Sequence, residues 1–254
     1  MVGLLAIYKI GLVLAVVLTL IYAFQGFYPE FMVSFSNAFP PFIAGAAVIS
    51  SDFAFRKYGH DLRERFSLVW LCFTFGMAFW FLGETGWAIY TLVLGVEIPY
   101  PSIADVFWLS GYFPLFLALY WYVKTFGFVL SRRTLVILMT TVFVLSVLVS
   151  AVLITPILGA EEDSITMLVD FAYPLLDLVL FSVAVLGLAV FLKGNLGKSW
   201  LLINAGILSN VGADILFSYM TAQETYYSGH PLELLFHFGY LLFLLAFYAH
   251  AKEL

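Results

Sequence analysis

Long uninterrupted runs of apolar residues recur along the whole chain, and short segments containing charged residues, glycine or proline separate them. The runs do not alternate between apolar and polar positions, as the strands of a membrane barrel would. In hydrocarbon a helix of about 20 apolar residues satisfies its own backbone while crossing the bilayer. The pattern predicts eight transmembrane helices, near residues 4–24, 36–55, 67–94, 103–126, 134–156, 165–192, 199–221 and 231–251.

The predicted fold is therefore all-α, a polytopic membrane helical bundle that forms a single transmembrane domain over residues 1–254. The composition agrees, with 63% hydrophobic and 11% charged residues, where soluble domains carry roughly 45–50% and about 25%. The first span has no basic segment before it and no small-residue cleavage pattern after it, so we expect it to remain as an anchor. Its removal would leave seven spans, and the charge pattern is compatible with either form.

Charge is distributed unequally between the two predicted membrane faces. With a cytoplasmic N-terminus, all 11 Lys and Arg residues fall on the cytoplasmic side, as positively charged loops do. The net charge of −5 is then an asymmetry between faces and not a signal for nucleic acid. We expect a multi-pass plasma-membrane protein in the lipid bilayer, with both termini cytoplasmic. The basic residues are Lys9, Arg56, Lys57, Arg63, Arg65, Lys124, Arg132, Arg133, Lys193, Lys198 and Lys252, and the acids opposite are Glu30, Glu97, Glu161, Glu162, Asp163 and Glu224.

The two halves of the chain carry acids, glycines and prolines in the same order. This predicts a tandem internal repeat, with repeat one at 1–126 and repeat two at 134–254, in a 4+4 arrangement whose halves share one orientation. The core would be spans 2–4 and 6–8, a 3+1+3 order with the fifth span as linker, and a site is expected on the axis between the halves. The matching pairs are Asp105 with Glu233, Gly111 with Gly239, Tyr112 with Tyr240, Gly76 with Gly206, Glu84 with Asp214, and Ala38-Phe39-Pro40 with Ala172-Tyr173-Pro174.

Glu84, Asp177 and Asp214 lie well inside predicted spans, with no Lys or Arg at comparable depth. Each such group costs about 2.5–3.5 kcal/mol on insertion, so it is a functional candidate by default. At a rise of about 1.5 Å per residue they lie roughly 15, 18 and 10 Å from the outer ends of their spans, and one cavity open to the outside could hold all three. Such carboxylates either bind a cation or keep their protons. The alternative is that each bonds to a Tyr, Trp or Asn on a neighbouring helix and only locks the bundle.

Helical spacing adds aromatic and polar side chains to these acids. Trp80 and Trp87 share a helix face with Glu84, and further polar or aromatic residues lie near the outer ends of other spans. The sequence therefore predicts an outward-facing, acidic and aromatic-lined ligand pocket. The candidate ligand-binding residues are Glu84, Trp80, Trp87, Asp105, Trp108, Tyr112, Tyr173, Asp177, Asn210, Asp214, Glu233 and His237.

No cofactor, metal or catalytic residue is predicted. His230, Glu233 and His237 are spaced so that they could offer a metal two or three ligands, but no Cys partner or H-E-x-x-H pattern accompanies them. A bound cation or metal remains an alternative there and at the three deep acids. A retinal protein would need a lysine in mid-membrane, which this chain lacks, and the single Cys72 rules out an internal disulfide.

Five short motifs together resemble a multi-helix membrane input region that precedes bacterial diguanylate cyclase, phosphodiesterase and histidine kinase domains. The resemblance covers residues 67–250 and keeps order and spacing, although a phenylalanine precedes the proline in the third motif. It implies signal reception. We expect a stand-alone copy, without an output domain after Lys252, that signals through a partner. The motifs are Trp80-Phe81-Leu82-Gly83-Glu84-Thr85-Gly86-Trp87, Pro101-Ser102-Ile103-Ala104-Asp105, Gly111-Tyr112-Phe113-Pro114-Leu115, Ala172-Tyr173-Pro174-Leu175-Leu176-Asp177 and Gly212-Ala213-Asp214.

Three functions are compatible with these observations. The leading hypothesis is a receptor-like or sensory membrane protein without enzymatic activity, which binds a small or cationic ligand from outside and signals to a cytoplasmic partner through residues 56–65 and 124–133. The second is a proton- or cation-coupled transporter of small solutes. The third is an intramembrane lipid-modifying enzyme that uses Asp177 and Asp214 as a pair.

Overall fold

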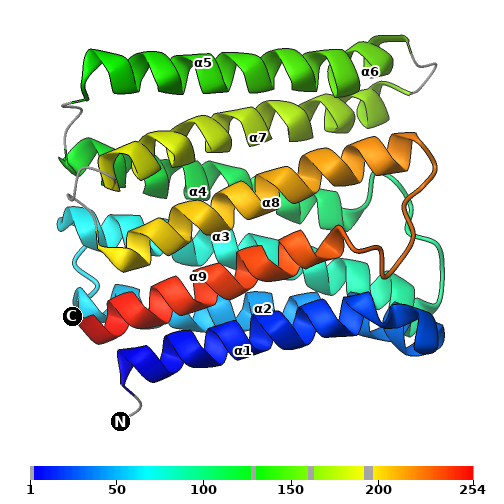
Figure 1. Cartoon of the computed structure of the whole chain (residues 1–254), viewed down its shortest axis with the longest axis horizontal. Coiled ribbons are helices and arrows are strands. Elements are labelled where there is room, and N and C mark those ends of the chain that lie inside the picture. Colours follow the sequence, from blue (N-terminus) through cyan, green and yellow to red (C-terminus); the bar gives the residue numbers. More distant parts are fainter. Residues whose placement is uncertain (1–2, 127–129, 160–162, 192–196, 254) are drawn as a thin grey trace.

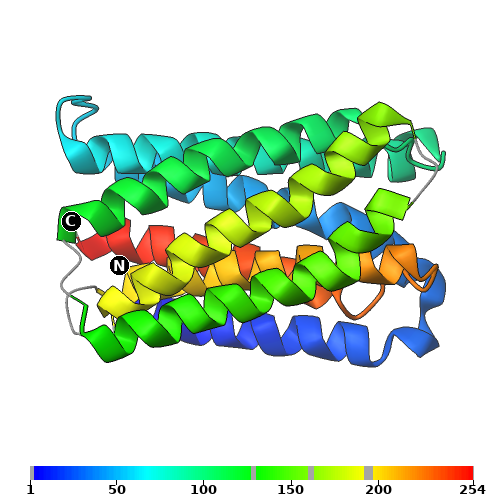
Figure 2. The same cartoon turned by 90° about the horizontal axis from the view of Figure 1, so that it is seen from above.

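The computed structural model describes residues 3–126, 130–159, 163–191 and 197–253, and within these ranges the chain is helical, without β-strands. Long helices run lengthwise, with their connections gathered at the two ends and both termini at the same end (Figures 1 and 2). The elements are α1 (Leu4–Ala23), a 3-10 turn η1 (Gln25–Phe27), α2 (Pro29–Lys57), α3 (Arg65–Ala88), a π-helical segment η2 (Ile89–Leu94), α4 (Ile103–Phe126), α5 (Arg132–Val149), a π-helical segment η3 (Ser150–Ile154), α6 (Thr155–Gly159), α7 (Ser164–Phe191), α8 (Lys198–Ala222) and α9 (Glu233–Glu253).

Eight helical segments of the described chain are long and apolar enough to cross a membrane, which confirms the predicted number. The main correction concerns α2, which begins at Pro29 and not near residue 36, because a proline is well suited to the first position of a helix. The third span is α3 continued by η2, and the fifth combines α5, η3 and α6. Glu161, Glu162 and Lys193, which the charge prediction used, lie outside the described residues.

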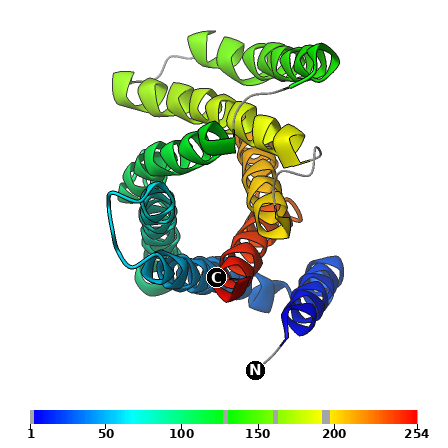
Figure 3. The same ribbon diagram turned by 90° about the vertical axis from the view of Figure 1, so that its left-hand side faces the viewer.

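The helices α2, α3, α4, α7, α8 and α9 form a ring, and α1, α5 and α6 lie outside it (Figure 3). Around the ring, α3 packs between α2 and α4, and α8 packs between α7 and α9. Contacts of α2 with α9 and of α4 with α7 close the ring. On the outside, α1 lies against α9, and α5 lies against α7. The ring therefore joins three helices from each half of the chain along two seams.

Glycines allow two helix pairs to approach closely. A Cβ atom added at Gly111 would lie 3.1 Å from the backbone oxygen of Gly76, where α3 meets α4. Likewise, a Cβ added at Gly206 would lie 3.1 Å from the backbone oxygen of Gly239, where α8 meets α9. Small residues at such points let the backbones of membrane helices come into contact. Gly76 with Gly111, and Gly206 with Gly239, thus allow a similar close approach in the two helix pairs.

Candidate functional site

Two deep acids meet at one tyrosine. The Tyr112 hydroxyl of α4 lies 2.6 Å from Oδ1 of Asp177 on α7 and 3.1 Å from Oδ2 of Asp214 on α8. The phenol has one hydrogen and can donate it fully to only one carboxylate. If both acids were ionised, the other would face the phenol oxygen with no hydrogen between them. The geometry therefore calls for a proton or a cation beside one of the two acids.

The third deep acid is bonded in the same manner by the other half of the chain. Tyr240 of α9 donates its hydroxyl to Oε1 of Glu84 on α3, over 2.7 Å. Thus a tyrosine of the first half serves acids of the second half, and a tyrosine of the second half serves an acid of the first. Within the described residues the ion pair is Asp52 with Arg56, at the surface, and no Lys or Arg pairs with the three deep acids.

The three acids differ in their access to solvent. Asp177 is buried, whereas Glu84 and Asp214 are partly exposed. Between these acids and the end of the bundle that holds the termini, axis-facing residues such as Met77 and Ile207 are fully buried. The name "acid chamber" is used below for the acids Glu84, Asp177 and Asp214 and their immediate surroundings inside the ring.

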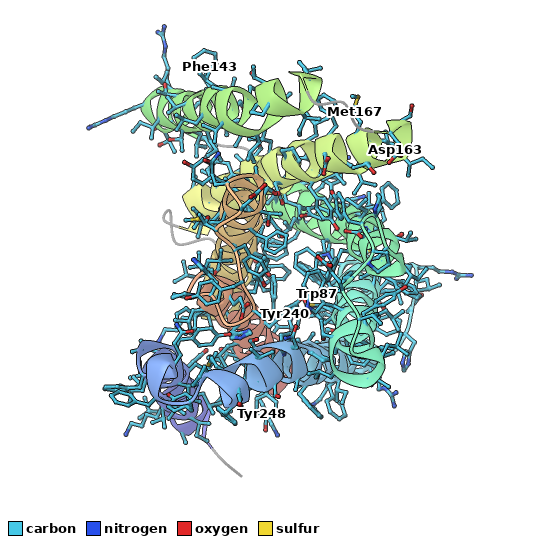
Figure 4. All side chains as sticks on the ribbon, turned by 90° about the vertical axis from the view of Figure 1, so that its right-hand side faces the viewer. Trp87, Phe143, Asp163, Met167, Tyr240 and Tyr248 are labelled. Carbon is cyan, nitrogen blue, oxygen red and sulfur yellow. The ribbon has the colours of Figure 1, made fainter. Side chains whose placement is uncertain are left out.

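Tryptophans surround the acid chamber, but two of their indole N–H groups are already bonded. Trp80 donates to the backbone oxygen of Trp108 over 3.1 Å, and Trp87 donates to Oδ1 of Asn37 over 2.8 Å. The rings of Trp87 and Trp108 lie 5.7 Å apart between centroids. Trp87 and Tyr240 point into the interior of the ring in Figure 4. The Trp108 side chain in turn hydrogen-bonds Glu84. The structure therefore brings these tryptophans close to the deep acids, with their N–H groups bonded to protein acceptors.

Asp105 is saturated by hydrogen bonds at the start of α4. It accepts from the backbone N–H of Ser102 at 2.7 Å, from the Ser102 hydroxyl at 2.9 Å and from the Tyr173 hydroxyl at 2.9 Å. An acid in the first turn also interacts favourably with the helix dipole. The structure therefore brings Asp105 and Tyr173 together, as a fixed link between α4 and α7.

Glu233 has the same position at the start of α9. It accepts hydrogen bonds from the hydroxyls of Tyr22 and Tyr226, each at 2.8 Å, and from the backbone N–H of Gly229 at 2.9 Å. Burial and the neighbouring Glu233 raise the pKa of Tyr226, which keeps that hydroxyl protonated as a donor. Three donors occupy most of the accepting capacity of one carboxylate. Glu233 thus ties α1, α9 and the segment before α9 together.

The histidines do not converge on a metal site. His237 is buried on α9, and its Nε2 lies 2.7 Å from the Tyr22 hydroxyl. His230 accepts a hydrogen bond at Nδ1 from the backbone N–H of Leu232 over 3.2 Å. Among the described residues, no group of three or more His, Cys, Asp or Glu side chains is placed to hold a metal ion.

Asn210 has a packing position. It donates to the backbone oxygen of Gly206 over 2.9 Å, one turn earlier on α8. Its amide fills the space that Gly239 leaves open, since a Cβ at Gly239 would lie only 2.0 Å from the Asn210 nitrogen. Asn210 thus stabilises the contact of α8 with α9 below the acid chamber.

Two tyrosines that matter here were absent from the candidate residues. Tyr240 bonds Glu84, and Tyr22 bonds both Glu233 and His237. The match of Tyr240 with Tyr112 in the two halves was a signal that could have identified the first. For Tyr22 the sequence offers no comparable signal, because it lies on α1, outside the ring.

Comparisons with known proteins give no further identification: no family model matches this chain, and no curated protein or solved structure is significantly similar to it.

Proposed function

We propose that this protein is a receptor-like membrane protein that binds a small cationic ligand in the acid chamber and passes a helix rearrangement to a cytoplasmic partner. The single observation that carries the proposal is the meeting of Glu84, Asp177 and Asp214 inside the ring without a basic partner. Acids are costly in a membrane and persist where they serve a pathway or a ligand. No catalytic step is part of the proposal.

The charge and access of the chamber support a cationic ligand. Glu84 and Asp214 keep partial exposure, while Met77 and Ile207, nearer the basic end, are buried. The rings of Trp87 and Trp108 lie 5.7 Å apart between centroids, and Trp108 hydrogen-bonds Glu84. Carboxylates combined with aromatic faces attract ammonium-type cations. Access from one side suits reception of a signal better than free conduction.

The orientation belongs to the same proposal. The end with both termini carries the basic loops, so we place it in the cytoplasm of a cell with its plasma membrane around the bundle. The acid chamber then opens to the exterior. The loops at residues 56–65 and 124–133 would contact the signalling partner, as in the membrane input regions that the sequence resembles.

The experiment is a stability measurement on the purified protein in lipid nanodiscs. Sodium, potassium, methylammonium and tetramethylammonium chlorides are each titrated at constant ionic strength, and thermal unfolding is followed by circular dichroism. A cation present at 100 times its Kd should stabilise the fold by about 2.7 kcal/mol. The double variant Glu84→Gln and Asp214→Asn should lose this response and keep its fold, because the amides retain the size and bonding groups of the acids.

The matched control is Asp52→Asn, which removes an acid at the surface, where Asp52 pairs with Arg56. It should respond to cations like the unchanged protein. If none of the four cations stabilises the protein, or if the double variant responds equally, the acid chamber is structural and the proposal is wrong.

A proton- or cation-coupled transporter is the second candidate, and the reciprocal tyrosine bonds favour it. We propose that residues 1–126 and 134–254 form the tandem 4+4 repeat. In support, a shift of 128 relates Tyr112 to Tyr240, and a shift of 130 relates their partners Asp214 and Glu84. Transporters often place the site between such halves. Flux in proteoliposomes that depends on pH or sodium, and that Glu84→Gln abolishes, would establish transport; absence of flux would remove this candidate.

A further inference from the structure

Aromatic side chains fill the interior of the ring near the end that carries the basic loops. Trp70 and Phe73 of α3 and Trp200 of α8 lie within 5.9 Å of one another between ring centroids, and Phe247 of α9 lies 5.3 Å from Trp70. These four residues and Tyr122 of α4 are buried. We call these five residues the aromatic plug. It occupies the level below the acid chamber, where α3, α4, α8 and α9 meet.

Two pairs of stacked rings at the aromatic plug connect the first half of the chain with the second. Trp70 stacks on His250 of α9, with centroids 4.6 Å apart and planes at 26°, and Trp200 stacks on Tyr122 of α4 with planes at 12°. The shift of 130 relates Trp70 to Trp200, and the shift of 128 relates Tyr122 to His250. The two stacks are therefore counterparts, just as the two tyrosine bonds of the acid chamber are.

The same helix pairs carry the stacks and the tyrosine bonds. Helices α3 and α9 are joined by Glu84 with Tyr240 above and by Trp70 with His250 below. Helices α4 and α8 are joined in the corresponding way. On α3 the two levels are 14 residues apart, which is about 21 Å at about 1.5 Å per residue. A rigid helix that leaves its partner at one level must shift or tilt at the other, and either movement changes how the stacked rings pack.

We infer that the aromatic plug is an inner gate, which closes the acid chamber toward the basic end and opens when the cross-half contacts at the acids are released. The inference rests on the proposed function only for what occupies the chamber. The closed state is the one described here, since the plug is buried and aromatic rings of three helices pack against one another. Packed cores switch between discrete arrangements rather than deforming continuously.

The test uses thiol accessibility in sealed membrane vesicles. Met77 is fully buried on α3, two turns beyond Trp70 toward the acids. Met77→Cys in a Cys72→Ser background places the protein's only thiol just behind the gate. A membrane-impermeant maleimide is applied to right-side-out and to inverted vesicles, and labelling of Lys252→Cys identifies the basic side. With the gate closed, Met77→Cys should stay unlabelled from that side.

Adding Trp70→Ala and Trp200→Ala should raise the rate of labelling from the basic side at least about tenfold, which corresponds to a gate weakened by about 1.4 kcal/mol. The matched control is Trp121→Ala, which shortens a partly buried tryptophan beside Tyr122 in sequence and should leave the rate unchanged. Equal rates in the two variants would show that the plug does not close the chamber, and the inference would be wrong.

A milder variant tests the coupling and guards against misfolding. Tyr112→Phe with Tyr240→Phe keeps both rings but removes the hydroxyls that bond the acids. If the levels are coupled, this variant should also speed labelling of Met77→Cys while the plug residues are intact; an unchanged rate would overturn the coupling. Cation stabilisation is measured on the same proteins to separate the two proposals. If the plug controls labelling but no cation stabilises the protein, the receptor proposal is wrong and the gate inference stands.

Discussion

Gly111→Ala should destabilise the bundle, because the added methyl group has no room. Its Cβ would lie 2.5 Å from Cδ1 and 2.7 Å from Nε1 of Trp80, and 3.1 Å from the backbone oxygen of Gly76. Trp80 is nearly buried and donates its N–H to the Trp108 backbone. Either that ring must move or α3 and α4 must separate.

The magnitude follows from three contributions. Overpacking of a tight core costs about 1–3 kcal/mol. Displacement of Trp80 would also lose a hydrogen bond worth about 0.5–1.5 kcal/mol. Against these stands the better helix propensity of alanine, about 1 kcal/mol. We therefore expect Gly111→Ala to lower the free energy of unfolding by about 0.5–3.5 kcal/mol in total.

Gly212→Ala is the matched control, because nothing lies within 4 Å of a Cβ added there. It should be neutral or stabilise by up to about 1 kcal/mol. Both variants are compared in mixed micelles by titration with sodium dodecyl sulfate, with helix content followed by circular dichroism. If Gly111→Ala proves as stable as Gly212→Ala, the close approach of α3 and α4 described here is refuted.

Three further predictions concern single side chains. Hydrogen bonds from the first turn of α7, above all from the Thr166 hydroxyl, hold the pKa of Asp163 below its ordinary 3.8. Asp163→Ala should therefore speed amide exchange in that turn at neutral pH. The difference between the two proteins should vanish as the pH falls below 3.8 and the carboxyl group of the folded protein is protonated. Tyr22→Phe should destabilise the attachment of α1 through its lost bond to Glu233, seen as faster proteolysis before α2. A double-mutant cycle of Tyr240→Phe with Glu84→Ala, which removes the acceptor of the hydrogen bond, should give a coupling of about 0.6 kcal/mol, and at most about 1.7, in the same detergent titration. Zero coupling would contradict their hydrogen bond.

The spans could be predicted from the sequence because the constraint on them is simple: a membrane helix must be apolar for about 20 residues. The eight predicted spans agree with the eight helical segments, and the start of α2 was missed because the polar residues before residue 36 hid a helix that begins at Pro29. The depth of a residue along its own helix also follows from its position in the sequence, so Glu84, Asp177 and Asp214 could be recognised as lying inside the membrane.

The hydrogen-bond partners of those acids could not be predicted, because the spacing of residues on one helix does not show which neighbouring helix its acid faces. Trp87 was expected to line a pocket beside Glu84, and in the structure its N–H is bonded to Asn37 of α2. Asp105 and Glu233 were candidates for ligand binding, and both are occupied by donors from the segments before their helices. Those bonds depend on loop conformation, for which an apolar pattern carries no information.

The link between the first and the last helix has a consequence for biosynthesis. During synthesis α1 enters the bilayer long before α9. Tyr22 of α1 nevertheless bonds to Glu233 and His237 of α9, and Glu84 has its hydrogen-bond partner Tyr240 only after α9 has been made. Until α9 arrives, the carboxyl group of Glu84 faces an unfinished ring without its hydroxyl partner. A nascent chain arrested before α9 would thus present an unsatisfied acid in the membrane, a mark by which quality-control proteases could distinguish unfinished copies from completed ones.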